Sequence, residues 1–331
     1  MFYEHLEGKK VRCFLCAHHC NIKEGKRGIC HVREHRGGVL NTLVYGKVIS
    51  MNVDPIEKKP LFHFLPGSTS LSIATVGCNF RCEHCQNYSI SEYPRVHDDI
   101  AGQDMTPEAV VDAAVRYGCE SISYTYTEPT IFFEFAFDCA KLARAKGIRN
   151  VFVSNGYTSP EAARAIAPYL DGNNIDLKGD DEFYRNLCGA RLKPVQETIR
   201  LMKELGIWVE VTTLIIPGYN DTDQQLQDIA GFLVSVDRSI PWHVSQFYPT
   251  HRLTDIPRTP LSALRKARDI GYRAGLVYVY EGNVPGEGGE DTHCPECQEL
   301  LIARVGFSIK EYRLKEAACP RCGFRIQGVW K

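Results

Sequence analysis

The chain has 331 residues, 44% of them hydrophobic and 24% charged, which is ordinary for a soluble globular protein and excludes a largely disordered chain. The 39 Lys and Arg residues nearly balance the 40 Asp and Glu residues, so the net charge gives no electrostatic indication of nucleic acid binding. No run of about 18 apolar residues is present, and the start of the chain lacks the apolar core of a signal peptide. We therefore expect a cytoplasmic protein that makes no contact with a membrane.

The chain contains 14 cysteines. In a cytoplasmic protein they indicate metal ligands or reactive thiols rather than disulfides, because cytosolic thiols stay reduced. Most of them fall in three clusters, within residues 13–30, 78–85 and 294–322, whereas Cys119, Cys139 and Cys188 stand alone in the sequence. Clustering of this kind predicts metal sites.

The first cluster predicts a small N-terminal metal module over residues 1–60. Its candidate ligands are Cys13, Cys16, Cys20 and Cys30, with His18, His19 and His31 nearby. These donors suffice for a tetrahedral zinc ion or for an auxiliary iron–sulfur cluster, and their irregular spacing does not choose between the two. Thiols that bind nothing are the third possibility. A strand-like run over 40–53 and a connector rich in proline and turn residues over 54–70 follow the cluster.

Residues 61–285 alternate short apolar runs with amphipathic segments. Strands are expected at 71–77, 120–126, 149–155, 173–178, 208–216, 242–248 and 276–282. Helices are expected at 106–118, 130–147, 159–170, 193–206, 221–236 and 259–275, where apolar residues recur at three- and four-residue spacing. This alternation predicts an α/β domain with a parallel sheet, flat or closed into a barrel, whose ligands bind at the carboxyl ends of the strands.

The second cluster directly follows the first of these strands, in the sequence VGCNFRCEHCQN. It places Cys78, Cys82 and Cys85 in C-x3-C-x2-C spacing. Three thiolates on one loop can bind three irons of a [4Fe–4S] cluster and leave the fourth iron open to a substrate or cofactor. Gly77 allows a sharp backbone turn out of the strand. The alternative is a zinc loop that takes a fourth ligand such as His84.

This spacing resembles that of the radical SAM superfamily, and the resemblance extends from about residue 71 to residue 282. It implies a partial (β/α)6 barrel in which the amino and carboxylate groups of S-adenosylmethionine (SAM) bind the open iron. It also implies an oxygen-sensitive enzyme in which an electron from the reduced cluster cleaves SAM to methionine and a 5′-deoxyadenosyl radical. His84 occupies the position where superfamily members usually carry an aromatic ring against the adenine, so the resemblance places it at the SAM site.

Polar residues at three later strand ends are further SAM-binding candidates under this resemblance. They are Thr127 and Glu128 in SYTYTEPT, Ser154 and Asn155 in VSNG, and Asp176 and Lys178 in NIDLKG. The first pair stands where many members have a GGE motif, and the last resembles the DLK segment of activating enzymes for glycyl radical enzymes. From the residues alone, Glu128 could instead cap a helix, Asn155 could belong to a turn, and Asp176 with Lys178 could be an ordinary ion pair.

The third cluster predicts a zinc-ribbon-like domain over residues 286–331. Two CxxC pairs, Cys294 with Cys297 and Cys319 with Cys322, flank a strand-like segment. This pattern is typical of a structural Zn²⁺ site, which would supply folding energy to a tail too short for its own hydrophobic core. A rubredoxin-like iron site has similar spacing and is the alternative.

The arrangement of all three clusters resembles one branch of the superfamily, the radical SAM enzymes of the AmmeMemoRadiSam system, which are related to pyruvate formate-lyase activating enzyme. The segments that carry this resemblance include CFLCAHHCNIKEGKRGICHVR, GCNFRCEHCQN, SYTYTEPT, NIDLKG and VYEGNVPGEGGEDTHCPEC. We expect an electron donor such as flavodoxin or ferredoxin. The substrate stays open.

Three functions agree with the sequence. The first is a radical SAM enzyme that abstracts hydrogen from a partner protein or a small molecule. The second narrows this chemistry to an activating enzyme that installs a glycyl radical in a partner enzyme, although the two outer cysteine modules exceed what a minimal activating enzyme needs. The third is a non-catalytic zinc protein that binds RNA or protein, for which the near-neutral charge offers no electrostatic footprint.

Overall fold

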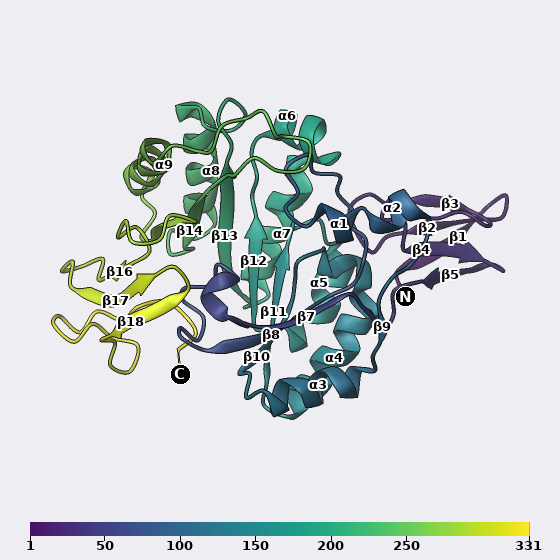
Figure 1. The fold of residues 1–331 in the computed structure, drawn as a ribbon, viewed down its shortest axis with the longest axis horizontal. Coiled ribbons are helices and arrows are strands. Elements are labelled where there is room, and N and C mark those ends of the chain that lie inside the picture. Colours follow the sequence, from purple (N-terminus) through teal and green to yellow (C-terminus); the bar gives the residue numbers. More distant parts are fainter. Residues whose placement is uncertain (331) are drawn as a thin grey trace.

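The central sheet of the protein has eight strands in a computed structural model that describes residues 1–330 (Figure 1). From one edge to the other the strands are β7 (Ser50–Pro55), β8 (Thr69–Ala74), β10 (Ser121–Tyr124), β11 (Arg149–Ser154), β12 (Gly172–Asp176), β13 (Trp208–Ile215), β14 (Trp242–Gln246) and β15 (Val279–Gly282). Every neighbouring pair is parallel except β7 and β8, which are antiparallel. The seven parallel strands coincide with the seven predicted ones, so the predicted parallel sheet is confirmed.

Six long helices connect successive parallel strands. They are α3 (Pro107–Arg116), α4 (Phe133–Ala145), α5 (Pro160–Ile166), α7 (Leu192–Glu204), α8 (Asp223–Val236) and α9 (Leu261–Ala274). Three of them begin after a hydroxyl side chain that accepts a backbone N–H hydrogen bond, at Thr106, Ser159 and Thr222. The result is six β–α units followed by a seventh strand, which agrees with the predicted α/β partial barrel.

Shorter helical turns lie in the connections. They are η1 (Ile56–Lys58), α1 (Tyr88–Ser91), α2 (Tyr93–His97), η2 (Pro129–Phe132), η3 (Ala167–Tyr169), α6 (Asp181–Phe183) and the π-helix η4 (Tyr184–Cys188). None of the described helices has the length and the apolar character needed to cross a membrane.

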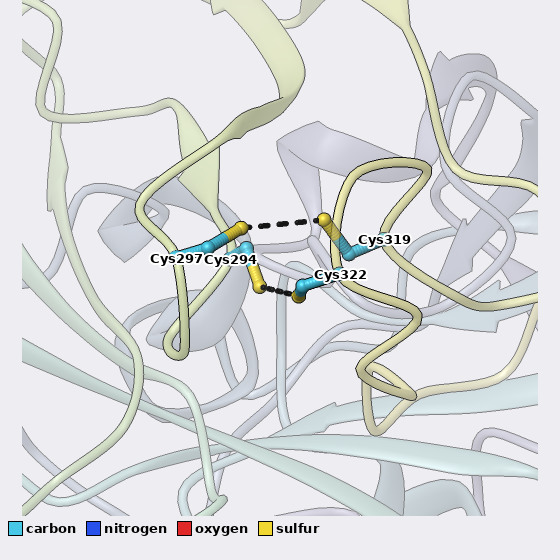
Figure 2. A group of neighbouring side chains, drawn as sticks. All are labelled: Cys294, Cys297, Cys319 and Cys322. Carbon is cyan, nitrogen blue, oxygen red and sulfur yellow. Dashed lines mark hydrogen bonds between the residues drawn. The ribbon is translucent and has the colours of Figure 1, made fainter.

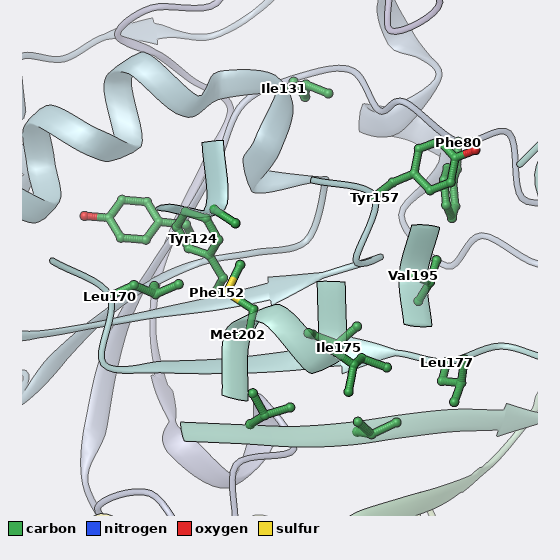
Figure 3. Close-up of a cluster of buried hydrophobic side chains, with 14 of the residues drawn as sticks. Phe80, Tyr124, Ile131, Phe152, Tyr157, Leu170, Ile175, Leu177, Val195 and Met202 are labelled. Atoms are coloured by element: carbon green, nitrogen blue, oxygen red, sulfur yellow. The ribbon is translucent and has the colours of Figure 1, made fainter. Parts of the chain in front are cut away.

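The main hydrophobic core fills the space between the sheet and the helices that cover it (Figure 3). Phe152 of β11 packs edge-on against Tyr124 of β10, with ring centroids 5.5 Å apart, and both side chains are fully buried. Burying a side chain of this size contributes about 2–3 kcal/mol. Val195 and Met202 of α7 belong to the same core. The apolar residues that recur along the helices therefore face the sheet, as the sequence predicts.

The strand-like run over 40–53 does not form one strand. It divides into β5 (Val39–Thr42), β6 (Lys47–Val48) and the first residues of β7, because the backbone turns at Gly46, whose φ is +72°. β5 pairs with β4 (Arg33–Arg36), and β6 pairs with β9 (Gln103–Asp104). β7 therefore belongs to the central sheet, although its residues fall inside the range 1–60. The boundaries of the three predicted domains stay a prediction.

The two small cysteine-rich parts lie at opposite ends of the central sheet (Figure 1). The N-terminal part contains β1 (Tyr3–Leu6), β2 (Lys10–Cys13) and β3 (Asn21–Lys23). It contacts the carboxyl side of β11, where the Ala17 N–H donates a 2.9 Å hydrogen bond to the Tyr157 carbonyl. The C-terminal part contains β16 (Thr292–His293), β17 (Leu300–Val305) and β18 (Ser308–Tyr312).

A segment that we call the strap, residues 56–65, connects the C-terminal part to the amino ends of the strands. The backbone N–H groups of Phe62 and His63 donate to the buried carboxylate of Glu210, near the start of β13, at 3.0 and 2.8 Å. The guanidinium of Arg304, on β17, donates to the Phe62 carbonyl at 2.8 Å. The C-terminal part thus lies far from the carboxyl edge, where ligands of such sheets bind.

Candidate functional site

The loop that carries the cysteine triad leaves β8 in a sharp turn. Gly77 has a φ of +98°, and a Cβ atom there would lie 2.6 Å from Val32 Cγ1. The loop then follows the end of η4, because the N–H groups of Arg81 and Glu83 donate to the carbonyls of Cys188 and Leu187 at 2.9 Å each. The predicted role of the glycine in the turn is therefore confirmed.

The triad thiols of Cys78, Cys82 and Cys85 are free and partly exposed at the carboxyl edge of the sheet. Within the described residues, these three sulfurs do not form a group in which all atoms lie within 4.8 Å of one another. A tetrahedral zinc site requires such a compact group, since Zn–S bonds of about 2.3 Å hold the sulfurs about 3.8 Å apart. Thiolates of a [4Fe–4S] cluster each bind a different iron and are spaced more widely. The three triad sulfurs by themselves thus do not form a zinc-sized group, whereas a cluster accepts their wider spacing.

Cys188 is a residue of this site that the sequence analysis did not assign. Its sulfur, the Cys82 sulfur and a ring nitrogen of His84 lie within 4.8 Å of one another. Cys188 ends the π-helix and is fully buried. The only signal in the sequence was its position ten residues after Lys178, on the connection that follows a functional strand end.

His84 lies in the same loop and is buried against Phe183, with ring centroids 5.6 Å apart. Its Nδ1 is buried and has no hydrogen-bond partner within the described residues. Burial lowers the pKa of His84 to about 3, so the ring is neutral. A neutral ring with a free polar atom can pack against a heterocycle and hydrogen-bond to it.

Glu128 organises two of the predicted SAM contacts. Its carboxylate accepts from the Ser154 hydroxyl at 2.9 Å and from the Asn155 N–H at 2.7 Å. It also accepts from the Thr130 N–H at 3.0 Å, which is the helix-capping role that the sequence left open. Burial raises the pKa of Glu128, although these donated hydrogen bonds act in the opposite direction. The carboxylate thereby fixes the ends of β10 and β11 relative to each other.

Asn155 connects this carboxylate to the triad. Its side-chain N–H group donates to Asn79 Oδ1 at 2.7 Å and lies 3.9 Å from the Cys78 sulfur. Thr127, the remaining candidate at this edge, donates its hydroxyl to the Thr75 carbonyl at 2.9 Å, just before the cluster loop. The structure therefore brings Asn155 to the triad, whereas the Thr127 hydroxyl is used to hold the backbone.

Asp176 and Lys178 form an ion pair at the end of β12, with Lys178 Nζ 2.6 Å from Asp176 Oδ2. Burial favours the neutral amine, but the Asp176 carboxylate raises the pKa of Lys178 well above its usual value. Asn220 donates to the Lys178 carbonyl at 2.7 Å and fixes this strand end. A charged ammonium group held in this way suits a carboxylate ligand.

The four C-terminal cysteines form the compact group that a tetrahedral metal site requires. Their sulfurs lie within 4.8 Å of one another, and those of Cys294 and Cys322, and of Cys297 and Cys319, are 3.6 Å apart (Figure 2). Both CxxC turns point their sulfurs toward a common centre. The predicted pairing of the two motifs in one site is therefore present in the fold.

The four N-terminal cysteines behave differently. Cys13, Cys16, Cys20 and Cys30 line one cavity, together with His18, Arg33 and Asn79. Among residues 1–330, however, no three of the cysteine and histidine donors near this cavity lie within 4.8 Å of one another. The structure thus brings the four predicted ligands around a common space without the compact geometry of the C-terminal group.

Comparisons with known proteins agree with this site. A sequence profile described as the Radical SAM superfamily matches residues 72–233. The chain is 50% identical to the uncharacterized protein MJ0808 of Methanocaldococcus jannaschii over 332 residues, 99% of this chain and 98% of that protein. It is 22% identical to a pyruvate formate-lyase-activating enzyme of Clostridium pasteurianum, over 59% of this chain and 80% of that enzyme.

The fold is also found in solved structures. A radical SAM methyltransferase from Sphaerobacter thermophilus has a TM-score of 0.53 and 16% identity, over 72% of this chain and 71% of the methyltransferase. The radical SAM profile covers the strands from β8 to β13 and the cysteine triad between them. The chain therefore contains a radical SAM domain and is an enzyme, and it belongs to the same family as MJ0808.

Proposed function

We propose that a [4Fe–4S] cluster bound by Cys78, Cys82 and Cys85 reductively cleaves SAM, and that the enzyme then abstracts a hydrogen atom from its substrate. The observation that carries this proposal is the meeting of the three free thiols with polar strand ends at one edge of the sheet. When bound, the cluster supplies the electron that breaks the bond between the sulfonium and C5′ of SAM. The protein supplies binding, orientation and exclusion of water.

The side chains around the triad are suited to hold SAM. Lys178 offers a positive charge to the SAM carboxylate, and Asp176 fixes that charge at 2.6 Å. His84 offers a neutral ring to the adenine. Glu128 positions Ser154 and Asn155, whose polar groups can reach the ribose or the methionine part, and Thr127 holds the backbone of the cluster loop.

The substrate is proposed as a partner protein or a small molecule, within the AmmeMemoRadiSam system, with a flavodoxin or ferredoxin as the electron donor.

The narrower alternative is that the enzyme installs a glycyl radical in a partner enzyme, which the similarity to a pyruvate formate-lyase-activating enzyme supports. An anaerobic mixture of the enzyme, SAM, reductant and a candidate partner should then develop a glycyl radical signal in electron paramagnetic resonance. Label transfer from another substrate into 5′-deoxyadenosine, without that signal, would favour the broader function. A non-catalytic zinc protein does not agree with the family of the chain.

The C-terminal group is proposed as a structural Zn²⁺ site bound by Cys294, Cys297, Cys319 and Cys322. Four sulfurs within 4.8 Å leave no open position for a substrate. The C-terminal part contacts the strap at the amino ends of the strands, whereas the triad follows the carboxyl end of β8, so a role in stability is favoured over a role in the reaction.

The central proposal is tested with Cys82→Ala after anaerobic reconstitution with iron and sulfide. This variant should lose the triad cluster and produce no 5′-deoxyadenosine from SAM and dithionite, because a cluster with two thiolate ligands is not retained. The matched control is Cys119→Ala, which removes a buried thiol just before β10, at the amino side of the sheet. Equal SAM cleavage by Cys82→Ala and the control would contradict the proposal.

A further inference from the structure

We infer that the four N-terminal cysteines bind a second [4Fe–4S] cluster, which passes electrons to the cluster of the triad. This inference rests on the proposed function of the triad and adds the identity of the N-terminal group and its role. It concerns Cys13, Cys16, Cys20 and Cys30, for which the sequence alone leaves zinc and iron–sulfur open.

The spacing of the sulfurs favours a cluster over zinc. The C-terminal group shows what a zinc-sized site looks like in this protein, since its four sulfurs lie within 4.8 Å. The triad, whose ligands each bind a different iron, does not form such a group within the described residues, and neither do the N-terminal four. The N-terminal four nevertheless line one common cavity. A tetrahedral zinc site holds its sulfurs about 3.8 Å apart, and these four do not have that geometry.

Two unpartnered donors line the same cavity. Arg33 Nε and Asn79 Nδ2 are buried and lack a hydrogen-bond partner within the described residues. The residues Arg33 and Asn79 are only 2% and 1% exposed. A buried donor without a partner is costly, by about 1–3 kcal/mol, so each is expected to meet an acceptor in the loaded protein. The sulfides and thiolates of an anionic cluster are such acceptors.

The cavity also touches the loop of the triad. His18 Nε2 lies 2.8 Å from the carbonyl of Asn79, which directly follows Cys78. The Cys30 carbonyl lies 3.2 Å from the position of a Cβ atom on Gly77, which directly precedes Cys78. The rings of Phe80 and Tyr157 pack against each other with centroids 5.1 Å apart (Figure 3). The His18 ring packs against the same Tyr157 ring, with centroids 4.7 Å apart. The two cysteine sites are thus joined through one hydrogen bond and a packed aromatic group.

The redox step needs only groups already named. With both clusters bound, the N-terminal cluster held by Cys13, Cys16, Cys20 and Cys30 would take one electron from a protein donor and pass it to the cluster held by Cys78, Cys82 and Cys85. That cluster would supply the same electron for the cleavage of SAM to methionine and the 5′-deoxyadenosyl radical, so both clusters would return to their starting state. One electron enters from the donor for each SAM that is cleaved.

The metal content is tested on the variant Cys78→Ala/Cys82→Ala/Cys85→Ala, prepared anaerobically. It should retain about four irons and four acid-labile sulfides per chain, and an electron paramagnetic resonance signal after reduction with dithionite. Sulfide separates a cluster from an iron ion in the C-terminal site. A second equivalent of zinc, with no sulfide, would overturn the inference. This measurement does not involve SAM, so its outcome is independent of the proposed reaction.

The electron transfer is tested with Cys20→Ala and the isosteric Cys20→Ser, which remove one N-terminal ligand. With reduced flavodoxin, SAM cleavage should fall at least tenfold. With titanium(III) citrate, a small reductant that reaches the triad directly, it should stay within twofold of the wild type. Cys139→Ala, which removes a buried thiol of α4, is the control and should lose neither activity. Equal losses with both reductants, or no loss with flavodoxin, would refute the transfer role.

Discussion

The cluster loop requires a backbone conformation at Gly77 that favours glycine. Its φ of +98° is strained for any side chain, and a Cβ atom would lie 2.6 Å from Val32 Cγ1. Val32 and Cys30 belong to the N-terminal part, so this one position holds the loop against the neighbouring cysteine site. The sequence predicts the turn, because a glycine directly precedes the first triad cysteine, but it does not show what packs there.

We predict that Gly77→Ala destabilises the protein by about 1–3 kcal/mol, because the methyl group overpacks a buried contact. Thermal unfolding should begin a few degrees lower, and the reconstituted variant should hold less iron at the triad. The control is Gly231→Ala in α8, where a Cβ atom meets nothing within 4 Å and alanine favours the helix by up to about 1 kcal/mol. A Gly77→Ala variant with unchanged stability and iron content would disprove this account.

Cys188 shows why part of the site could not be predicted from the sequence. The triad is recognisable because its ligands are adjacent in the chain, whereas Cys188 reaches Cys82 only through the fold of α6 and the π-helix. Such short helices carry no periodic pattern, so their ends are not predictable from spacing. The polar strand ends were predictable in position, because parallel strands bring their carboxyl ends to one edge, but their hydrogen-bond partners were not.

At the scale of elements, periodic segments were predicted well and short pairings were not. The helices α7 and α9 bury one apolar stripe each and match their predicted ranges within two residues. β7 was not predicted as a separate strand, because it lies within a longer strand-like run. Its antiparallel pairing with β8 depends on the turn at Gly46 and on contacts elsewhere. The strap was predicted to be a plain connector, although its backbone makes buried hydrogen bonds to side chains of two strands, β12 and β13.

His63 of the strap gives a prediction on pH. Its Nδ1 bonds to the Gln327 carbonyl at 2.7 Å, and its Nε2 bonds to the Tyr280 hydroxyl at 2.5 Å, which suits the neutral ring. Burial lowers the pKa of His63 to about 4. An unfolded histidine has a pKa of about 6.5, so the unfolded state binds more protons between these two values. Stability should therefore fall as the pH is lowered from 6.5 to 4, by at most about 1.4 kcal/mol per pH unit from this group.

The measurement is the free energy of unfolding of the wild type and of His63→Gln across this range. The difference in unfolding free energy between the two proteins should shrink as the pH falls. Only the wild type has a histidine at position 63, which is neutral when buried but takes up a proton when the chain unfolds. His5→Gln, at an exposed position of β1, is the control and should follow the wild type in parallel. A constant difference between wild type and His63→Gln at all pH values would show that the His63 ring does not titrate on unfolding.

At the scale of the whole molecule, the three cysteine groups fall into two classes by position. The triad and the N-terminal group share the carboxyl edge of the sheet, and the C-terminal group lies at the opposite end (Figure 1). The spacing of the cysteines in the sequence predicts three sites. It does not predict which sites lie next to each other, because that depends on how the residues after β11 and the strap fold. The proposed separation of a catalytic site from a structural site therefore rests on the fold and not on the spacing of the cysteines.

We predict that Cys297→Ala chiefly destabilises the C-terminal part and leaves the triad intact. Loss of one thiolate should weaken or abolish zinc binding, and the buried side chains Leu301 and Ile302 then lose the framework that holds them. Arg304 should release the Phe62 carbonyl, so the strap becomes open to limited proteolysis.

Chelation of zinc from the wild type should produce the same cleavage pattern. Iron and sulfide at the triad should be retained in both cases, since the triad lies after the carboxyl end of β8, whereas the described residues of the C-terminal part contact the strap at the amino ends of the strands. Parallel loss of zinc and triad iron in Cys297→Ala would mean that the two ends of the molecule unfold as one unit, and the structural site would then be a condition for the catalytic one.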